Sequence, residues 1–396
     1  MLSDDRMRQA IRGRWAVAAV FLVNGFLIGS WAPQIPVTRD RLEISEFTLG
    51  LLILGFGLGA LIAMPVCGYL IGRIGSRSTV RLFGLASTFG LLVVALAPGI
   101  WTAAAALVLL GALIGGTDVA MNANAVEVEK QMRRAIMSSS HGFWSVGGFI
   151  GGGAGGAVIQ ASDHRVHAVV VTAIALAGML VAVRFMVTEP RPESQAPHRF
   201  SLPRNPVVYL VGLIALFSMI PEGAVLDWAA IYLREERGAD LATAGLGFAA
   251  FSATMAVMRF VGDKVRNRFG AVRTLRVSSL VAAAGMLVAG FSQEPWLAIA
   301  AFGLAGLGIA NMVPIAFSAA GNQPGTSSGA SLSTVTLMGY SGILVAPSAI
   351  GFVGERFGFA PVYVAVSVLL VVVCLMAGLA RAAEFDAAGG SGRPSQ

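Results

Sequence analysis

Charged residues, cysteine and histidine are all scarce in this sequence. Only 12% of the 396 residues are charged, and the chain has two cysteines and four histidines. Soluble domains carry about 25% charged residues, so the low share excludes an ordinary soluble protein. Cys67 and Cys374 stand far apart within apolar runs, which excludes a disulfide framework and a zinc site. Because no nucleotide-binding or metal-ligand motif occurs, we expect no cofactor, no metal and no enzyme activity.

Basic residues are single and dispersed. The formal net charge is +7, from 26 Arg and 2 Lys against 21 acidic residues. Basic runs interleaved with aromatic residues, which are typical of nucleic-acid-binding proteins, do not occur. We therefore exclude nucleic acid as a partner.

Long apolar runs make up most of the chain. Apolar residues account for 56% of it, and a membrane-spanning helix needs roughly 20 of them in succession. The sequence predicts an all-α polytopic protein of the lipid bilayer. No cleavable signal peptide is expected, because the first run follows Arg12 and Arg14 and is long enough to remain as a span. The twelve predicted transmembrane helices are 15–37, 47–71, 79–97, 101–126, 138–160, 166–187, 206–232, 241–262, 272–291, 295–318, 327–351 and 359–380.

The placement of Lys and Arg predicts the orientation of these helices. With the N-terminus in the cytoplasm, 21 of them fall on the cytoplasmic side and six on the other, and Arg259 lies within a helix. Loops rich in Lys and Arg stay in the cytoplasm. We therefore expect a multi-pass protein of the cell inner membrane with both termini in the cytoplasm.

A polar, proline-containing stretch divides the twelve helices into two sets of six. The predicted organisation is an N-terminal six-helix bundle at 1–187, a cytoplasmic linker at 188–205, a C-terminal six-helix bundle at 206–382 and a flexible cytoplasmic tail at 383–396. Each half also has a turn made of glycine, a short spacer, arginine and glycine, at 68–77 and at 262–270. Two such halves are the repeat pattern of transporters that rock about a site at the midplane.

The turn at 68–77 resembles a known signature. The major facilitator superfamily has Gly-x-x-x-Asp-Arg-x-Gly-Arg-Arg between its second and third helices. This resemblance implies two pseudo-symmetric six-helix bundles that work by alternating access. The family's acidic residue latches one conformation, and Gly72 and Asn267 stand in its place here. On this basis we assign gating roles to Gly68, Arg73, Gly75 and Arg77, and to Asp263 and Arg268 of the second half.

Asp118 is the most informative polar residue, because a charge at the centre of a bilayer costs at least ~2.5–3.5 kcal/mol. A spacing of four places Asn122 on the same helical face. We predict that Asp118 takes up a proton on one side and releases it on the other; the alternative is a carboxyl group that only packs helices. The pair is similar to helix 4 of the fucose–proton symporter branch. That branch also has an acidic residue in helix 1, where this chain offers Asn24, Trp31 and Gln34 as solute ligands.

The predicted helix 206–232 contains a second acidic segment. Pro221 and Gly223 favour a break there, of the kind that lines transport sites. Glu222, Asp227 and Trp228 are therefore candidate solute ligands, with a gate near the outer end as the alternative for both acids.

Further polar residues suit gating or solute binding. His141 and Trp144 are predicted to gate, or His141 only satisfies a loop carbonyl. Arg259 is assigned to gating, either pairing with a carboxylate or extending to the cytoplasm. Asn311 and Tyr340 supply neutral hydrogen-bonding groups for a hydroxylated solute, and Tyr340 and Trp31 can stack on a ring or fill packing space.

Glycines in the fifth predicted helix bear on direction. Gly147, Gly151, Gly155 and Gly156 resemble the antiporter signature of the superfamily, although Gly152 stands where a proline is expected. This resemblance implies export in exchange for protons, with close helix packing as the alternative.

The details of helices 4, 5 and 7 look like the branch of YbjJ-like and MosC-type proteins, the latter associated with rhizopine, a methylated amino-cyclitol. We therefore expect a monomeric, proton-coupled secondary transporter of a small hydroxylated solute such as a sugar, polyol or amino-cyclitol. Export by proton antiport is the preferred direction. The alternatives are proton-driven sugar uptake and a membrane receptor that does not transport.

Overall fold

The structure is a computed structural model, and it describes residues 4–31, 33–44, 46–189, 202–239 and 241–384. Most of the predicted linker and the predicted tail beyond Glu384 lie outside these residues. The described chain is helical, and its elements are α1 (Asp4–Trp31), α2 (Gln34–Leu42), α3 (Glu46–Ile74), α4 (Ser76–Ser87), α5 (Gly90–Leu96), α6 (Ile100–Met132), α7 (Met137–Ala161), α8 (His164–Phe185), α9 (Pro206–Glu235), α10 (Leu241–Phe269), α11 (Ala271–Phe291), α12 (Pro295–Ile309), α13 (Met312–Gly321), α14 (Ser328–Phe357), α15 (Ala360–Met376) and the 3₁₀ helix η1 (Ala377–Ala383).

Nine helical segments in the described part of the chain are long and apolar enough to cross a membrane. The long helices α7, α10 and α14 accompany them, with 25, 29 and 30 residues. Leaving out the short α2, and counting α4 with α5, α12 with α13 and α15 with η1 as single spans, gives the twelve helices that the sequence predicts. Large apolar side chains remain exposed along them, as expected where lipid is the solvent.

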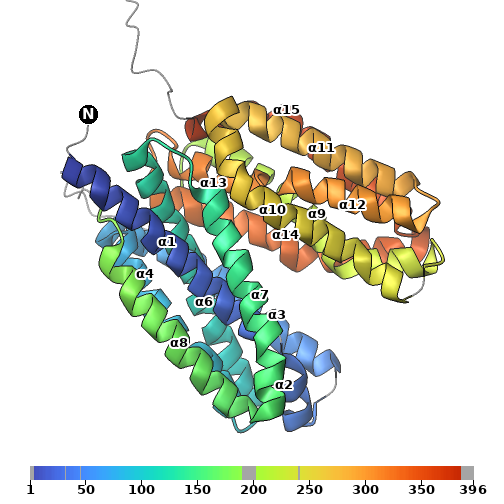
Figure 1. Ribbon diagram of the computed structural model, residues 1–396, viewed down its shortest axis with the longest axis horizontal. Coiled ribbons are helices and arrows are strands. Elements are labelled where there is room, and N and C mark those ends of the chain that lie inside the picture. The colour runs from blue at the N-terminus through green and yellow to red at the C-terminus, as the bar shows by residue number, and fades with distance from the viewer. Residues whose placement is uncertain (1–3, 32, 45, 190–201, 240, 385–396) are drawn as a thin grey trace, which may run out of the picture.

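The helices form two groups. Helix α1 packs on α7, α8 and α6, and α3 packs on α6; in the second group α9 packs on α14 and α10, and α11 on α12 and α15. The groups meet where α3 lies against α14 and α7 against α10. Figure 1 shows them converging at the end where α1 begins and η1 lies, and diverging toward the end that carries α2. We call these the proximal and distal ends.

The basic turns of the two halves have the same conformation. Gly75 has φ 82° and ψ 160°, and Gly270 has φ 83° and ψ 162°, a region that favours glycine. Each precedes a helix whose first backbone amides are capped by a glutamate that follows the last helix of its half. Glu189 accepts from the Ser76 amide at 2.8 Å, and Glu384 accepts from the Val272 amide at 3.2 Å. The internal repeat therefore extends to backbone and capping geometry.

Close packing accounts for the glycine pattern of α7. A Cβ atom on Gly147 would overlap the Leu22 carbonyl, and one on Gly25 or Gly29 of α1 would overlap the carbonyls of Trp144 or Gly148. The backbones of α1 and α7 therefore cross with no room for side chains between them. Close helix packing is the alternative that the sequence left open beside the antiporter signature.

The structure corrects three local predictions. The expected break near Pro221 was wrong, because α9 is continuous and packing on α14 and α10 outweighs the one backbone hydrogen bond that a proline removes. The first predicted helix ends at Trp31, and Gln34 belongs to the separate α2. Helix 79–97 is interrupted between Ser87 and Gly90, which the sequence analysis did not predict.

Candidate functional site

Asp118 lies midway along α6, and its side chain is only 4% exposed. Its Oδ2 atom has no hydrogen-bond partner among the described residues. Tyr340 of α14, in the other half, lies within electrostatic range of the carboxyl group. A buried carboxylate without an ion-pair partner is strongly destabilising. The site is therefore suited to binding a proton or a ligand cation.

Asn122 and His141 continue this polar group toward the proximal end. The Asn122 side-chain amide donates to the Asp118 backbone carbonyl at 2.9 Å, and His141 Nε2 lies 3.3 Å from Asn122 Oδ1. The His141 ring packs edge-on against Phe21 and at a tilt against Phe317 of the other half. His141 thus contacts a side chain on α6, where the sequence had left a loop carbonyl as an alternative.

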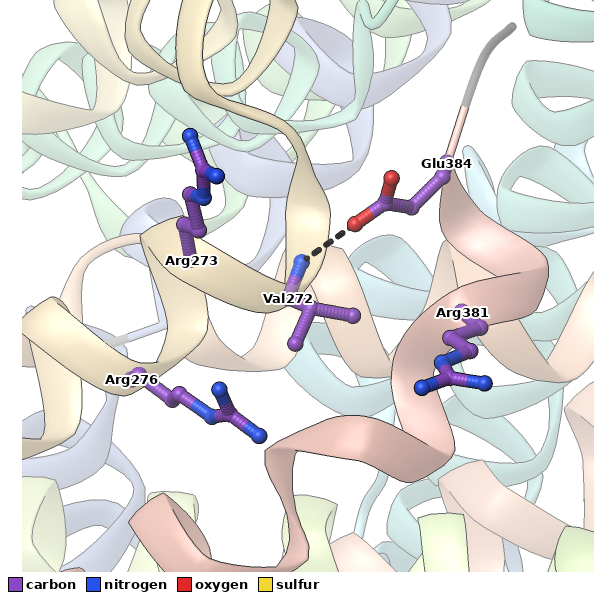
Figure 2. Close-up of a pocket in the computed structure, with 5 residues that line it drawn as sticks. All are labelled: Val272, Arg273, Arg276, Arg381 and Glu384. Atoms are coloured by element: carbon purple, nitrogen blue, oxygen red, sulfur yellow. Dashed lines mark hydrogen bonds between the residues drawn. The ribbon is translucent and has the colours of Figure 1, made fainter.

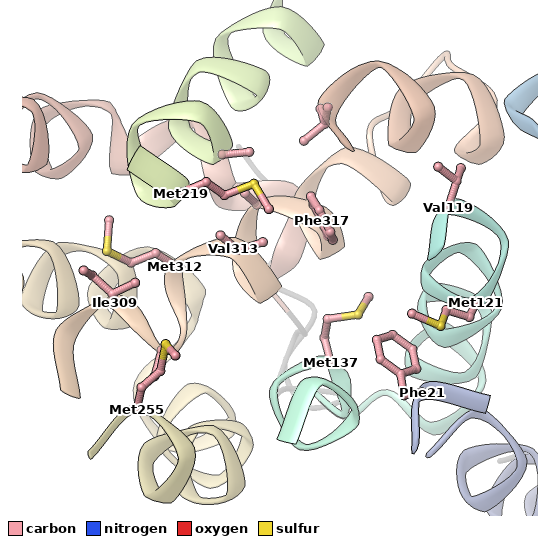
Figure 3. Packing of buried hydrophobic residues seen from close by; sticks show 14 of the residues in the cluster. Phe21, Val119, Met121, Met137, Met219, Met255, Ile309, Met312, Val313 and Phe317 are labelled. Carbon is pink, nitrogen blue, oxygen red and sulfur yellow. The ribbon is translucent and has the colours of Figure 1, made fainter. Parts of the chain in front are cut away.

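Buried methionine and phenylalanine side chains lie where the halves meet, and the His141 ring contacts two of the phenylalanines. Figure 3 shows Phe21, Met121 and Met137 of the N-terminal half near Phe317 of the C-terminal half, with Met312 farther away beside Ile309. Methionine is unbranched and adapts its shape to its neighbours. Such a contact can be broken and remade when the halves move.

Arg259 pairs with Glu222 in the C-terminal half. The Arg259 Nη2 atom lies 3.7 Å from Glu222 Oε2, and Nη1 donates to Ser145 Oγ of α7 at 2.6 Å. Of the two sequence interpretations of Arg259, the structure shows pairing with a carboxylate. Tyr340 is within electrostatic range of both Glu222 and Asp118. The arginine therefore neutralises Glu222 and leaves Asp118 without a described ion-pair partner.

Two predicted solute ligands near the start of the chain occupy different places. Asn24 of α1 is buried and accepts from Trp144 Nε1 at 3.0 Å, while its own Nδ2 has no partner among the described residues. Gln34 on α2 donates to the His164 carbonyl at 2.8 Å and lies 2.9 Å from His167 Nδ1. Asn24 therefore faces α7, and Gln34 joins α2 to α8 at the distal end.

The remaining predicted ligands are spread along the bundle. Trp31 is buried at the end of α1, and Asp227 is exposed, so the structure does not bring Asp227 together with Glu222. Trp228 stacks on Phe359, with ring centroids 5.1 Å apart. Asn311 is buried at the junction of α12 and α13, and neither end of its amide has a partner within the described part of the chain.

Two predicted gating residues lie where the halves meet. Gly68 of α3 leaves no room for a side chain, because a Cβ atom there would overlap Ser333 of α14. Asp263 of α10 accepts from the backbone amides of Ser138 and Ser139 at 3.0 and 2.9 Å, at the first turn of α7. A carboxylate at a helix N-terminus is favourable. Asp263 therefore joins the second half to the first.

The other three predicted gating arginines, besides Arg259, differ in their contacts. Arg77 donates to the backbone carbonyls of Val183 and Arg184 at 3.2 and 2.9 Å, which joins α4 to the end of α8 within one half. Arg73 is exposed and lies near the Tyr69 hydroxyl, and Arg268 is exposed beside the Phe269 ring.

A buried ion pair that the sequence analysis missed joins the halves. Arg266 Nη1 lies 3.0 Å from Glu129 Oε1, and Ser318 Oγ donates to Glu129 Oε2 at 2.5 Å. Glu129 also accepts from the backbone amides of Ile136 and Met137. The predicted helix ended at residue 126, which placed Glu129 in a loop, and Arg266 counted only as an orientation charge within the basic turn at 262–270. Their separation of 137 residues left no local signal.

Other contacts close the proximal end. Lys130 Nζ donates to the Gly321 carbonyl at 3.4 Å, and the Ala135 amide donates to Asn267 Oδ1 at 2.8 Å. Asn267 stands where the superfamily signature has an acidic residue. With Glu129 and Asp263, these groups hold the two halves against each other at the proximal end.

Comparisons with known proteins agree with this architecture. The family model of the Major Facilitator Superfamily matches residues 15–235 and 211–394. An uncharacterised MFS-type transporter of Yersinia pestis is 34% identical, covering 95% of this chain and 98% of that protein. Membrane protein MosC of Rhizobium meliloti is 32% identical, covering 87% and 84%. The crystal structure of the transporter FucP in its outward conformation superimposes with a TM-score of 0.82 at 16% identity, covering 94% and 99%.

These relatives match nearly the whole chain, and the fold shows the same two sets of helices. A membrane-embedded, multi-pass architecture with polar groups where the halves meet is the architecture of a transporter. The chain belongs to the major facilitator superfamily.

Proposed function

We propose that this transporter exchanges protons for a small hydroxylated solute that carries an amine, in the class of amino-cyclitols and amino sugars. The observation that supports this most strongly is the buried carboxyl group of Asp118, which has an unpartnered oxygen and faces Tyr340 of the other half. A solute ammonium group and a proton compete for one carboxylate. Mutually exclusive binding at one site makes transport an exchange.

The charges around Asp118 favour a cationic solute. Arg259 is paired with Glu222, so Asp118 carries the excess negative charge of the group. A neutral sugar would leave that charge uncompensated, whereas an ammonium group would pair with it. The amine is therefore the part of the solute that we assign to Asp118.

Unpartnered polar groups support a solute with hydroxyls. Asn24 Nδ2 and both ends of the Asn311 amide are buried without partners in the described residues. Buried polar groups are nearly always hydrogen-bonded. Solute hydroxyls both donate and accept, and they would satisfy these amides.

We propose that the proximal end faces the cytoplasm of a cell whose inner membrane holds the protein, because most Lys and Arg lie at that end. The contacts of Glu129 and Asp263 then close the cytoplasmic side. Opening would require these contacts to break and others to form at the distal end. One chain carries both halves, so a monomer is sufficient for alternating access.

Uptake of a neutral sugar with protons is the second candidate. The fold similarity to FucP, a fucose:proton symporter, favours this candidate. In that case Asp118 would carry the proton together with the solute, and an amine would give no advantage.

A thermal-shift comparison of inositol with an inosamine, its amino analogue, tests the proposal. The purified protein is measured with each compound at two pH values, one on either side of neutrality. We expect inosamine to raise Tm more at the higher pH, where Asp118 binds fewer protons, and inositol to show no such pH dependence. Equal shifts for both compounds at both pH values would contradict an amine-binding carboxylate.

A further inference from the structure

A basic pocket lies on the surface of the C-terminal half at the proximal end. It is a cavity of about 350 Å³ between the first two turns of α11 and the end of η1, and Figure 2 shows its five lining residues. They are Val272, Arg273, Arg276, Arg381 and Glu384. The central transport site lies between the halves, whereas this pocket is formed by helices of one half.

The side chains of the three arginines in this pocket carry charge that the described part of the chain does not pair. No carboxylate or carbonyl in the described residues pairs with the side chains of Arg273, Arg276 or Arg381, and all three are exposed. Figure 2 shows the guanidinium groups of Arg276 and Arg381 pointing toward one another across the opening. Glu384 accepts from the Val272 amide at the N-terminus of α11. The pocket therefore has three cations for one carboxylate that is already engaged.

Apolar side chains continue from this pocket along the same helix. Val277 and Leu280 are four residues beyond Arg273 and Arg276, so each arginine shares a helical face with an apolar residue one turn further into the membrane. Their exposed fractions are 62% and 50%. The helix thus presents charge at the membrane surface and apolar surface directly beneath it.

From this arrangement we infer that the pocket binds the phosphate of an anionic phospholipid. Guanidinium groups bind phosphate oxygens in bidentate fashion, and basic pockets between membrane helices at the cytoplasmic side suit anionic head groups. The acyl chains would lie on the apolar face at Val277 and Leu280. A soluble phosphate would use the arginines but would gain nothing from that face.

Native mass spectrometry of the protein in mixed micelles of phosphatidylglycerol and phosphatidylcholine tests this inference. We expect the wild-type protein to retain phosphatidylglycerol selectively, and R276Q/R381Q to bind it about thirtyfold more weakly, from the attraction of two basic residues near a membrane surface. The matched control is R8Q/R12Q, which removes two exposed arginines of α1 at the same end. Equal retention by R276Q/R381Q and the wild-type protein would overturn the site.

A competition arm separates the lipid from a soluble source of phosphate. Glycerol phosphate is added in excess to the wild-type complex with phosphatidylglycerol. We expect the lipid to remain bound, because only the lipid also contacts the apolar face. Displacement of the lipid by glycerol phosphate would overturn the lipid assignment. Neither outcome depends on the transport activity proposed above.

Discussion

Replacing Asp118 by asparagine removes the charge and keeps the shape of the side chain. Asp118 has no described ion-pair partner, so the folded chain loses little by this change. A solute ammonium group, in contrast, loses its counter-charge. A hydrogen bond to a charged group contributes about 1.5–3 kcal/mol, so the Kd for inosamine should rise about 10- to 150-fold. The Kd for inositol should change far less.

The pH dependence of binding should disappear with the charge. In the wild-type protein a proton must leave Asp118 before the amine binds. In the pH range where the carboxyl group is protonated, the affinity for inosamine should therefore fall about tenfold for each unit by which the pH is lowered. D118N has no carboxyl group at this position, so its affinity for inosamine should not show this dependence on pH.

Calorimetric titration of purified D118N with both compounds over a pH series measures both effects. The matched control is D40N, because Asp40 is an exposed carboxylate on α2 whose side chain is 67% exposed. D40N should bind like the wild-type protein. A D118N variant that keeps the amine preference and the pH slope would refute the assignment of Asp118.

Three further sets of substitutions test the contacts that hold the helices around the site. E129Q removes the carboxylate that pairs with the buried Arg266 and should lower the unfolding free energy by about 3–5 kcal/mol. Its control E127Q, at a half-buried residue, should cost under about 1 kcal/mol. Thermal unfolding measures both. Burial raises the pKa of Glu189 above its ordinary value of 4.5, so the folded chain binds this proton more tightly than the unfolded chain. The Tm of the wild-type protein relative to E189Q should therefore fall as pH rises from 4.5 through the raised pKa. G29A should lose about 1–3 kcal/mol to overlap with α7, whereas G223A, whose Cβ meets nothing within 4 Å, should gain up to about 1 kcal/mol of helix propensity.

Distinct results would contradict each of these expectations. For the ion pair, the double variant E129Q/R266Q should recover part of the loss, and a double variant no better than E129Q would mean that the charge pairing is unimportant. For Glu189, a Tm difference that grows with pH would reverse the sign of the linkage. For the glycines, equal unfolding temperatures of G29A and G223A would remove the argument for tight α1–α7 packing.

Much of the architecture was predictable because lipid imposes a simple pattern on the sequence. Apolar runs of the length needed to span a bilayer predicted the spans, and the repeated glycine–arginine turns predicted the two halves. Asp118 was also predictable as an unusual residue, because any carboxyl group in the middle of a span needs a reason. These are properties of single segments.

Contacts between distant segments were not predictable. Glu129 and Arg266 each look like a charge at a helix end, and only the fold brings them together. Pro221 indicated a break, but packing on α14 and α10 keeps α9 continuous. The sequence placed Gln34 at the end of the first predicted helix, whereas its side-chain amide joins α2 to α8. In each case the partner lies on another helix, so local composition holds no information about it.

Proton movement in reconstituted vesicles tests the central claim most directly. Proteoliposomes in weak buffer receive inosamine outside, and a pH indicator follows the external medium. We predict acidification outside as the solute enters and protons leave, and no such change with D118N. External alkalinisation, or inosamine entry without any proton movement, would contradict exchange at Asp118.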